Sequence, residues 1–243
     1  MRNWLIILGF TLMPGLSMAQ ENSVKLDSVK IDHDDKPSLQ RGAKLFVNYC
    51  LSCHSAAYMR YNRMAKDLDI PKRLVEQYMM FTADKIGGLM KSNMPPEEAK
   101  RAFGTVPPDL TLIARSRTPE WIYTYLRSFY RDKTSPSGWN NIVFPQVAMP
   151  FILYRLQGVQ SAVFDKDKTT GARRFDKFEL IQKGTMTPQE YAVAMRDLTN
   201  YLAYMAEPAK IVRHHIGRYA MVFLGLLLVL VVLLKHEYWR DVK

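Results

Sequence analysis

Two cysteines and a histidine stand together in the sequence C-L-S-C-H, at Cys50, Cys53 and His54, and the 243-residue chain contains no other cysteine. Two thiols at this spacing can add to the two vinyl groups of one porphyrin, while the adjacent imidazole reaches the iron from one face. A chain built this way has to fold around a large, flat cofactor. The motif therefore predicts one covalently bound haem c, attached through Cys50 and Cys53 and ligated by His54.

Other uses of a C-x-x-C pair explain the motif less well. A structural disulfide or a thioredoxin-like dithiol does not require the histidine that follows, and no alternation of strands and helices surrounds the motif. A zinc site needs a fourth ligand, and no second Cys/His pair stands at finger-like spacing. Haem attachment is the interpretation that uses all three residues.

A second axial ligand has to come from elsewhere in the chain, and a thioether would favour reduced iron. Met149 lies in F-P-Q-V-A-M-P, where prolines bracket a segment that can hold a side chain rigidly over a flat ring. Met94 has a similar setting in N-M-P-P. His33 is a weaker candidate, because its acidic H-D-D segment is expected to be exposed. Local sequence thus leaves Met149 and Met94 open.

The N-terminal residues resemble an export signal. Arg2 precedes an apolar stretch over residues 4–16, and S-M-A ends at Ala19 in the small-x-small pattern that a signal peptidase accepts. The apolar stretch would make only about 20 Å of helix, which is short for a bilayer. We therefore predict a signal peptide at residues 1–19 and a mature chain that begins near Gln20.

The C-terminal end predicts one transmembrane helix over residues 212–238, within an anchor and tail at 209–243. Residues 219–234 are an unbroken apolar run, and a core helix of a soluble domain would carry a polar face. Basic residues flank the run on both sides, so local charge decides its orientation only weakly. The export signal places the body in the periplasm and the tail at 235–243 in the cytoplasm.

Residues 20–208 suffice for one domain of about 190 residues with a real core, and their patterning is mainly α-helical. We predict helices over residues 39–50, capped by Ser38, and over 119–130, behind Thr118. A further helix begins at the capping box of Thr187 and Glu190 and is closed by Pro208. The turn-rich D-K-D-K-T-T-G predicts a small hairpin within residues 163–180.

Two segments resemble class I cytochromes c. In that family a glycine and an aromatic residue on the first helix pack against a D-L-x-x-Y-L sequence on the last one. Here Gly42 and Phe46 match the first pattern, and D-L-T-N-Y-L at 197–202 matches the second. The resemblance implies a class I cytochrome c-like haem domain with insertions, in which Gly42 permits close approach of the two helices.

The whole mature chain resembles cytochrome c1 of the bacterial type, the haem subunit of the ubiquinol:cytochrome c oxidoreductase (bc1) complex. The resemblance rests on C-L-S-C-H together with G-T-V-P-P-D-L-T-L-I-A-R-S-R, G-W-N-N, F-P-Q-V-A-M-P, A-E-P and the C-terminal anchor. It implies that Met149, not Met94, is the second axial ligand. It also implies an arginine against a haem propionate, with Arg117 the nearer match and Arg115 the alternative.

The resemblance further implies an electron relay in a respiratory chain. A Rieske iron–sulfur protein would reduce the haem beside the cytochrome b subunit, and the haem would reduce a periplasmic c-type cytochrome. The chain would be no enzyme on its own, but one subunit of a dimeric complex in the bacterial inner membrane. Two rival functions are a monohaem cytochrome that serves another oxidase or reductase, and a membrane-tethered thiol redox protein.

Charge bears on the partners. The formal net charge of +11 becomes +10 when Arg2 leaves with the signal, and about +8 with two haem propionates. Mitochondrial members of the family offer acidic patches to a basic cytochrome c, whereas this chain has only short acidic clusters. An acidic or membrane-tethered acceptor therefore stays open. Nucleic acid, the usual partner of a basic chain, is excluded for an exported haem protein.

Overall fold

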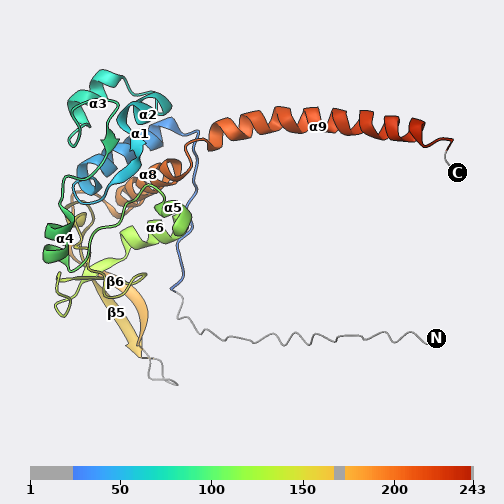
Figure 1. Ribbon diagram of the computed structural model, residues 1–243. Helices are drawn as coiled ribbons and strands as arrows, with labels where there is room; N and C mark the ends of the chain where they lie inside the picture. Colours follow the sequence, from blue (N-terminus) through green and yellow to red (C-terminus); the bar gives the residue numbers. More distant parts are fainter. Residues whose placement is uncertain (1–23, 167–172, 242–243) are drawn as a thin grey trace, which may run out of the picture.

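Two helices from opposite ends of the domain's sequence cross at its centre. The computed structural model describes residues 24–166 and 173–241, so the predicted signal at 1–19 lies outside them (Figure 1). Helix α1 (Lys36–Leu45) continues into a π-type turn, η1 (Phe46–Cys50), and crosses α8 (Pro188–Ala206). A Cβ on Gly42 would lie 2.1 Å from the Asp197 carbonyl oxygen. Glycine is therefore required at this crossing, as the resemblance predicted.

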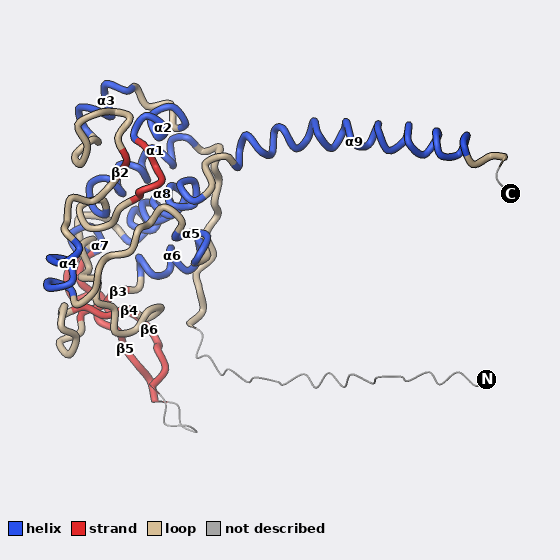
Figure 2. The backbone as a smooth tube through the Cα atoms, in the orientation of Figure 1, coloured by secondary structure: helices blue, strands red, loops and turns tan. Residues whose placement is uncertain are grey.

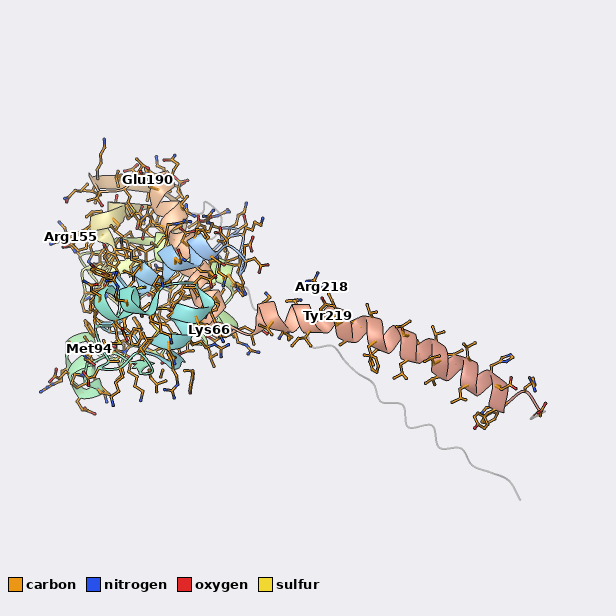
Figure 3. The ribbon with its side chains drawn as sticks, turned by 90° about the horizontal axis from the view of Figure 1, so that it is seen from above. Lys66, Met94, Arg155, Glu190, Arg218 and Tyr219 are labelled. Atoms are coloured by element: carbon orange, nitrogen blue, oxygen red, sulfur yellow. The ribbon has the colours of Figure 1, made fainter. Side chains whose placement is uncertain are left out.

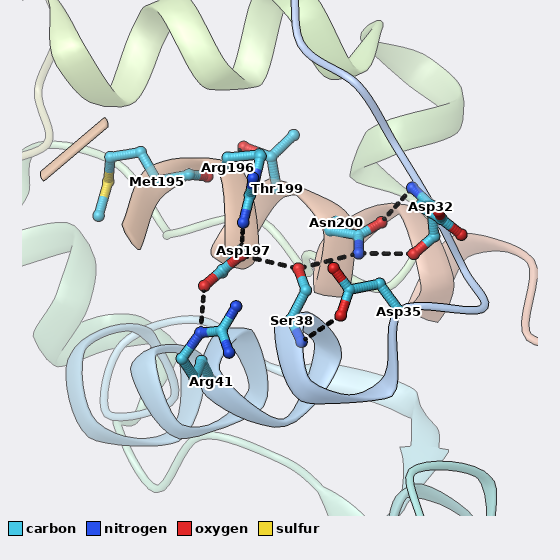
Figure 4. Close-up of polar contacts among 9 residues, drawn as sticks. All are labelled: Asp32, Asp35, Ser38, Arg41, Met195, Arg196, Asp197, Thr199 and Asn200. Atoms are coloured by element: carbon cyan, nitrogen blue, oxygen red, sulfur yellow. Dashed lines mark hydrogen bonds and ion pairs between the residues drawn. The ribbon is translucent and has the colours of Figure 1, made fainter. Parts of the chain in front are cut away.

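Polar side chains hold this crossing together as well as apolar ones (Figure 4). Ser38 Oγ donates to Asp197 Oδ1 at 2.7 Å, and Arg41 Nε donates to Asp197 Oδ2 at 2.6 Å. The predicted cap of the first helix is wrong. The helix begins at Lys36, and Asp35 caps it by accepting a bond from the Ser38 amide at 3.0 Å. Ser38 is buried inside the helix because its hydroxyl binds Asp197.

Helix α6 packs on α8 and begins where the sequence predicted. Thr118 accepts a bond from the Trp121 amide at 3.2 Å and caps α6 (Pro119–Arg127), which follows the short α5 (Ile113–Ser116). The helix ends at Arg127 instead of residue 130. The next residues form β3 (Phe129–Arg131), which pairs antiparallel with β4 (Trp139–Asn141) and so competes with a further helical turn.

The remaining elements are short, apart from one hairpin that projects away from the crossing of α1 and α8 (Figure 2). The predicted hairpin is present as β5 (Gly158–Lys166) and β6 (Arg173–Lys183), longer than expected, with its turn outside the described residues. The capping box of Thr187 and Glu190 is confirmed. The other elements are α2 (Tyr61–Asp67), α3 (Lys72–Tyr78), α4 (Pro96–Phe103), α7 (Tyr154–Gln157), and the antiparallel pair β1 (Ala56–Arg60) and β2 (Leu89–Met90).

Helix α9 (Lys210–Tyr238) extends away from the domain as a single helix (Figure 1). Its 29 residues make about 43 Å of helix. The stretch Val212–Tyr238 is long and apolar enough to cross a membrane, and its most apolar window buries nothing against the described part of the chain. Arg218 and Tyr219 lie on this helix, clear of the domain (Figure 3). The helix fits the predicted anchor.

Candidate functional site

The C-L-S-C-H motif forms a tight turn at the end of η1. The amides of Cys53 and His54 both donate to the Cys50 carbonyl oxygen, at 3.1 and 2.8 Å. Cys50 is buried, Cys53 is half-buried, and the two thiols are not joined to each other. Burial, with a smaller contribution from Cys53, raises the pKa of the Cys50 thiol to about 12. The buried thiol is therefore protonated at neutral pH.

His54 is held in one orientation by the P-P-D-L segment. Its Nδ1 lies 2.8 Å from the Pro108 carbonyl oxygen, which can only accept, so Nδ1 carries the proton and Nε2 carries the lone pair. Burial lowers the pKa of His54, with the Pro108 hydrogen bond opposing it, so the imidazole is neutral near pH 7. The segment is anchored on the motif, because the Leu110 amide donates to the Ser55 carbonyl at 2.8 Å.

Met149 lies half-buried against the same core that contains Cys50. Tyr125 Oη donates to its sulfur at 3.4 Å. The Tyr125 ring is fixed, because it stacks on Trp121 at 5.0 Å and meets the edge of Phe129 at 5.0 Å. The sequence analysis missed Tyr125. The aromatic residues at positions 121 and 125 were the available signal, since a spacing of four places both rings on one face of α6, and Phe129 joins them from β3.

Met94 also lies near the motif, through its neighbour Ser92. The Ser92 hydroxyl donates to the Ser52 carbonyl at 2.7 Å and accepts from the Met94 amide at 3.1 Å. Met94 itself is half-buried and lies at the edge of the domain (Figure 3). Within the described residues no hydrogen bond reaches its sulfur. Of the two methionines, Met149 packs against the core and has its sulfur oriented by a hydrogen-bond donor, whereas Met94 lies at the edge of the domain.

The two candidate arginines lie in different surroundings. The Arg117 guanidinium lies over the Trp121 ring at 4.9 Å, next to the aromatic stack that ends at Met149. Arg115 instead lines a separate cavity with His33. The expectation that the H-D-D segment is exposed is wrong for His33, whose two ring nitrogens are both buried. This segment packs on α8, and Asn200 bonds the Asp32 backbone on both sides.

The donor set fits the haem that the motif predicts. It comprises two free thiols, an imidazole whose Nε2 is unprotonated, and a thioether whose orientation is set by a hydroxyl donor. Within the described ranges, no group of three or more His, Cys, Asp and Glu side chains could hold a bare metal ion. Together with α9, this arrangement is typical of a membrane-anchored haem protein.

Comparisons with known proteins narrow that class. Residues 28–242 match the model of the Cytochrome C1 family. The chain is 47% identical to cytochrome c1 of Allochromatium vinosum over the full length of both proteins. It is 44% identical to a Nitrosomonas europaea protein named ammonia monooxygenase gamma subunit, covering 98% of this chain and 97% of that one. It is 25% identical to cytochrome c1 of Rhodospirillum rubrum, covering 86% and 83%.

The chain belongs to the cytochrome c1 family. Members bind haem and are membrane-anchored electron-transfer subunits of the bc1 complex, together with cytochrome b and a Rieske protein, and are not enzymes on their own. The family and the respiratory role that the sequence predicted are confirmed. The roles of individual residues stay predictions.

Proposed function

We propose that this chain carries single electrons from the Rieske iron–sulfur protein to a periplasmic c-type cytochrome. The proposal rests on the imidazole of His54, which the Pro108 carbonyl holds in one orientation with Nε2 unprotonated. Cys50 and Cys53, whose thiols are not joined to each other, precede it in the same motif. When bound, the haem iron supplies reversible one-electron chemistry. No acid–base group of the chain would have to act, because the transfer of a single electron requires no proton transfer.

The chain's own residues divide the work of holding the haem. Cys50 and Cys53 would attach the haem through thioethers, and His54 Nε2 and the Met149 sulfur would hold its iron. The Pro108 carbonyl keeps the proton on His54 Nδ1, which keeps Nε2 available. Arg117 meets a propionate. Arg115 is the less supported alternative, because it lines a different cavity.

The domain boundaries follow from the same proposal. Residues 1–19 direct export, residues 20–208 form the periplasmic haem domain, and residues 209–243 anchor the chain in the inner membrane of a dimeric complex. Residues 20–208 carry a formal charge of +6, which becomes about +4 with two haem propionates. We therefore expect an acceptor with an acidic or membrane-tethered surface, since opposite charges steer docking.

Purification of the tagged chain from its native membrane tests the relay. We expect cytochrome b and a Rieske protein to co-purify, and quinol to reduce the haem of this chain in the isolated complex. Removal of the Rieske protein should abolish that reduction while dithionite still reduces the haem. Isolation with a terminal oxidase, and without cytochrome b, would contradict the proposal.

Spectroscopy of two methionine variants tests the ligand set. Met149→Leu should keep the haem attached, lose the weak near-infrared band of sulfur ligation and lower the reduction potential, because a thioether stabilises ferrous iron. Met94→Leu is the matched control and should retain both properties. Cys50→Ala should weaken covalent attachment, measured as haem that survives acid–acetone extraction. Loss of the band in Met94→Leu alone would reverse the assignment.

The Nitrosomonas europaea relative supports a second candidate function. Its name is that of an ammonia monooxygenase subunit, and it matches nearly the whole chain. The same purification separates the two candidates. Partners that oxidise ammonia, found in place of cytochrome b and the Rieske protein, would favour the second.

A further inference from the structure

A cavity of about 360 Å³ lies at the junction between the domain and α9. Its walls come from the N-terminal segment, α5, the start of α6, the end of α8 and the start of α9. Figure 1 shows the N-terminal segment in blue and α5 on the side of the domain from which α9 leaves. The cavity is separate from the candidate haem site, because none of Cys50, Cys53, His54 or Met149 lines it.

His33 is the unexplained group in this cavity. Both of its ring nitrogens are buried and have no hydrogen-bond partner among the described residues. Burial, and next the charge of Lys210, lower the pKa of His33, so the neutral ring offers one donor and one acceptor. Its backbone cannot easily turn away, because Asn200 bonds the neighbouring Asp32 at 3.0 and 2.8 Å. Such unsatisfied groups are uncommon and call for an occupant.

Charges of both signs line the same cavity. Arg115 and Lys210 provide cations that form no ion pair with other described side chains, and Glu120 provides a carboxylate that is likewise unpaired there. The other acid, Glu207, pairs with Arg213. The remaining walls are mostly apolar. The complementary ligand therefore carries an anion, an ammonium group and some apolar surface.

The position of the cavity at the start of α9 indicates the source of such a ligand. The candidate span Val212–Tyr238 has 27 residues, about 40 Å of helix, which matches a bilayer with its headgroup layers. Lys210 precedes this span by two residues, about 3 Å along the helix. The wall of the cavity that contains Lys210 therefore borders the lipid headgroups on the side of the membrane where the domain lies.

We propose that this cavity binds the headgroup of a phosphoethanolamine-bearing phospholipid. The phosphate lies between Lys210 and Arg115, the ammonium group faces Glu120, and the His33 side chain turns so that one ring nitrogen, buried in the empty site, reaches the headgroup. A lipid held here fixes the angle between the domain and α9. The proposal does not depend on the haem ligands or on the electron partners.

Native mass spectrometry of the full-length, haem-loaded chain in mild detergent tests the site. Short-chain phosphatidylethanolamine should bind delipidated protein at one lipid per chain. Lys210→Gln should raise its dissociation constant at least tenfold. Lys30→Gln is the matched control, because Lys30 is exposed on the N-terminal segment and lies outside the cavity. Equal weakening by both variants would reduce the effect to surface charge and overturn the proposal.

His33→Leu provides a readout that a purely structural role would not give. The empty variant should unfold at a higher temperature than wild type, because it loses buried unsatisfied nitrogens, yet it should bind the lipid more weakly. An unchanged haem spectrum shows that the variant is folded. A variant that is destabilised when empty, or that binds lipid as well as wild type, would overturn the assignment of His33.

Two competing ligands and one cross-link identify the source of the phosphate. Phosphatidylcholine should bind several-fold more weakly, since its quaternary ammonium cannot donate a hydrogen bond to Glu120, and Glu120→Gln should remove the difference. Inorganic phosphate should not displace the bound lipid at equal concentration. Displacement by phosphate would make this a free-anion site. A photo-cross-link from position 114 to cytochrome b in the assembled complex, with no lipid present, would make it a protein contact.

Discussion

Helices α8 and α9 follow one another in the chain but obey opposite rules of burial. Helix α8 buries polar and apolar side chains together, and its Asp197, Thr199 and Asn200 are each at most 2% exposed. The apolar side chains of α9 are exposed, with Phe223 at 63% and Leu224 at 52%. Each of these three buried polar groups of α8 has a hydrogen-bond partner. The apolar window of α9, in contrast, packs against no part of the described chain.

The two helices are suited to different surroundings: α8 to the packed interior of the protein, and α9 to an apolar phase outside it. The burial of α8 is supplied by the protein, so its polar groups are tolerated only because they are paired. The apolar surface of α9 gains nothing in water and requires a second apolar phase, in which all its backbone groups are satisfied within the helix. The domain and its anchor should therefore respond independently to mutation.

Removal of α9 should have the largest effect on this comparison. A chain that ends at Pro208 and is exported normally should be soluble, because it loses the long exposed apolar surface of α9. Its haem spectrum should stay unchanged, since α8 and its contacts remain. Fractionation and absorption spectroscopy measure both. Membrane retention of the truncated chain after a salt wash would show that the domain binds lipid or partner by itself.

Glycine substitutions compare the two helices directly. Gly42→Ala should destabilise the domain by about 3 kcal/mol or more, because the new Cβ would meet the Asp197 backbone and force α1 and α8 apart. Gly217→Ala on α9 is the matched control, with nothing within 4 Å of the new Cβ. It should leave the guanidinium unfolding midpoint of the domain unchanged. Alanine has the higher helix propensity, so a loss of stability in Gly42→Ala has to come from packing. A Gly42→Ala variant that is as stable as wild type would contradict the close approach of α1 and α8.

Local patterns predicted the elements whose signals are local. The capping box at Thr187, the cap at Thr118, the hairpin and α9 all depend on residues close in sequence, and all are present. The cap at Ser38 and the end of α6 were wrong, because each depends on a distant partner. Ser38 binds Asp197, 159 residues away, and the residues after Arg127 pair with a strand.

The candidate site divides in the same way. The motif fixed the identity of Cys50, Cys53 and His54 as candidates, because chemistry places them side by side in sequence. The contact of Tyr125 with the Met149 sulfur and the inward turn of His33 could not be predicted, since their surroundings form only when the domain packs. Pattern identifies which groups carry the chemistry. Packing decides which neighbours orient them.

Asp197 tests the rule that buried polar groups of α8 must be paired. Burial opposes its ionisation, but hydrogen bonds from Arg41, Arg196 and Ser38 together hold the pKa of Asp197 below 3.8. Asp197→Asn should cost about 1–3 kcal/mol of unfolding free energy at pH 7. The estimate stays modest because the Arg41 and Arg196 side chains are 53% and 40% exposed, so water screens both ion pairs.

The lowered pKa of Asp197 determines how the stability difference between wild type and variant changes with pH. A carboxyl group with a lowered folded pKa stabilises the protein above its unfolded value, and that contribution is lost as the pH falls through the folded value. The difference between wild type and Asp197→Asn should therefore be full at pH 7 and shrink below pH 3.8. Denaturant titrations across this range measure it. A difference that persists undiminished at pH 2 would mean that shape, not charge, is lost.

The smallest effect extends the pairing rule from α8 to the hydroxyl on α6. The positive end of the Tyr125 O–H dipole points at the Met149 sulfur, which is the proposed iron ligand, and it therefore disfavours the extra positive charge of ferric iron. Burial raises the pKa of Tyr125 well above 10, so the hydroxyl stays protonated. Tyr125→Phe should then lower the reduction potential by about 20–60 mV, the equivalent of one hydrogen bond.

Tyr123→Phe, on the same helix, makes the same chemical change without touching the sulfur and should leave the potential unchanged. Spectroelectrochemistry measures both, and equal shifts in the two variants would show that the hydroxyl acts through general polarity instead of its bond to Met149.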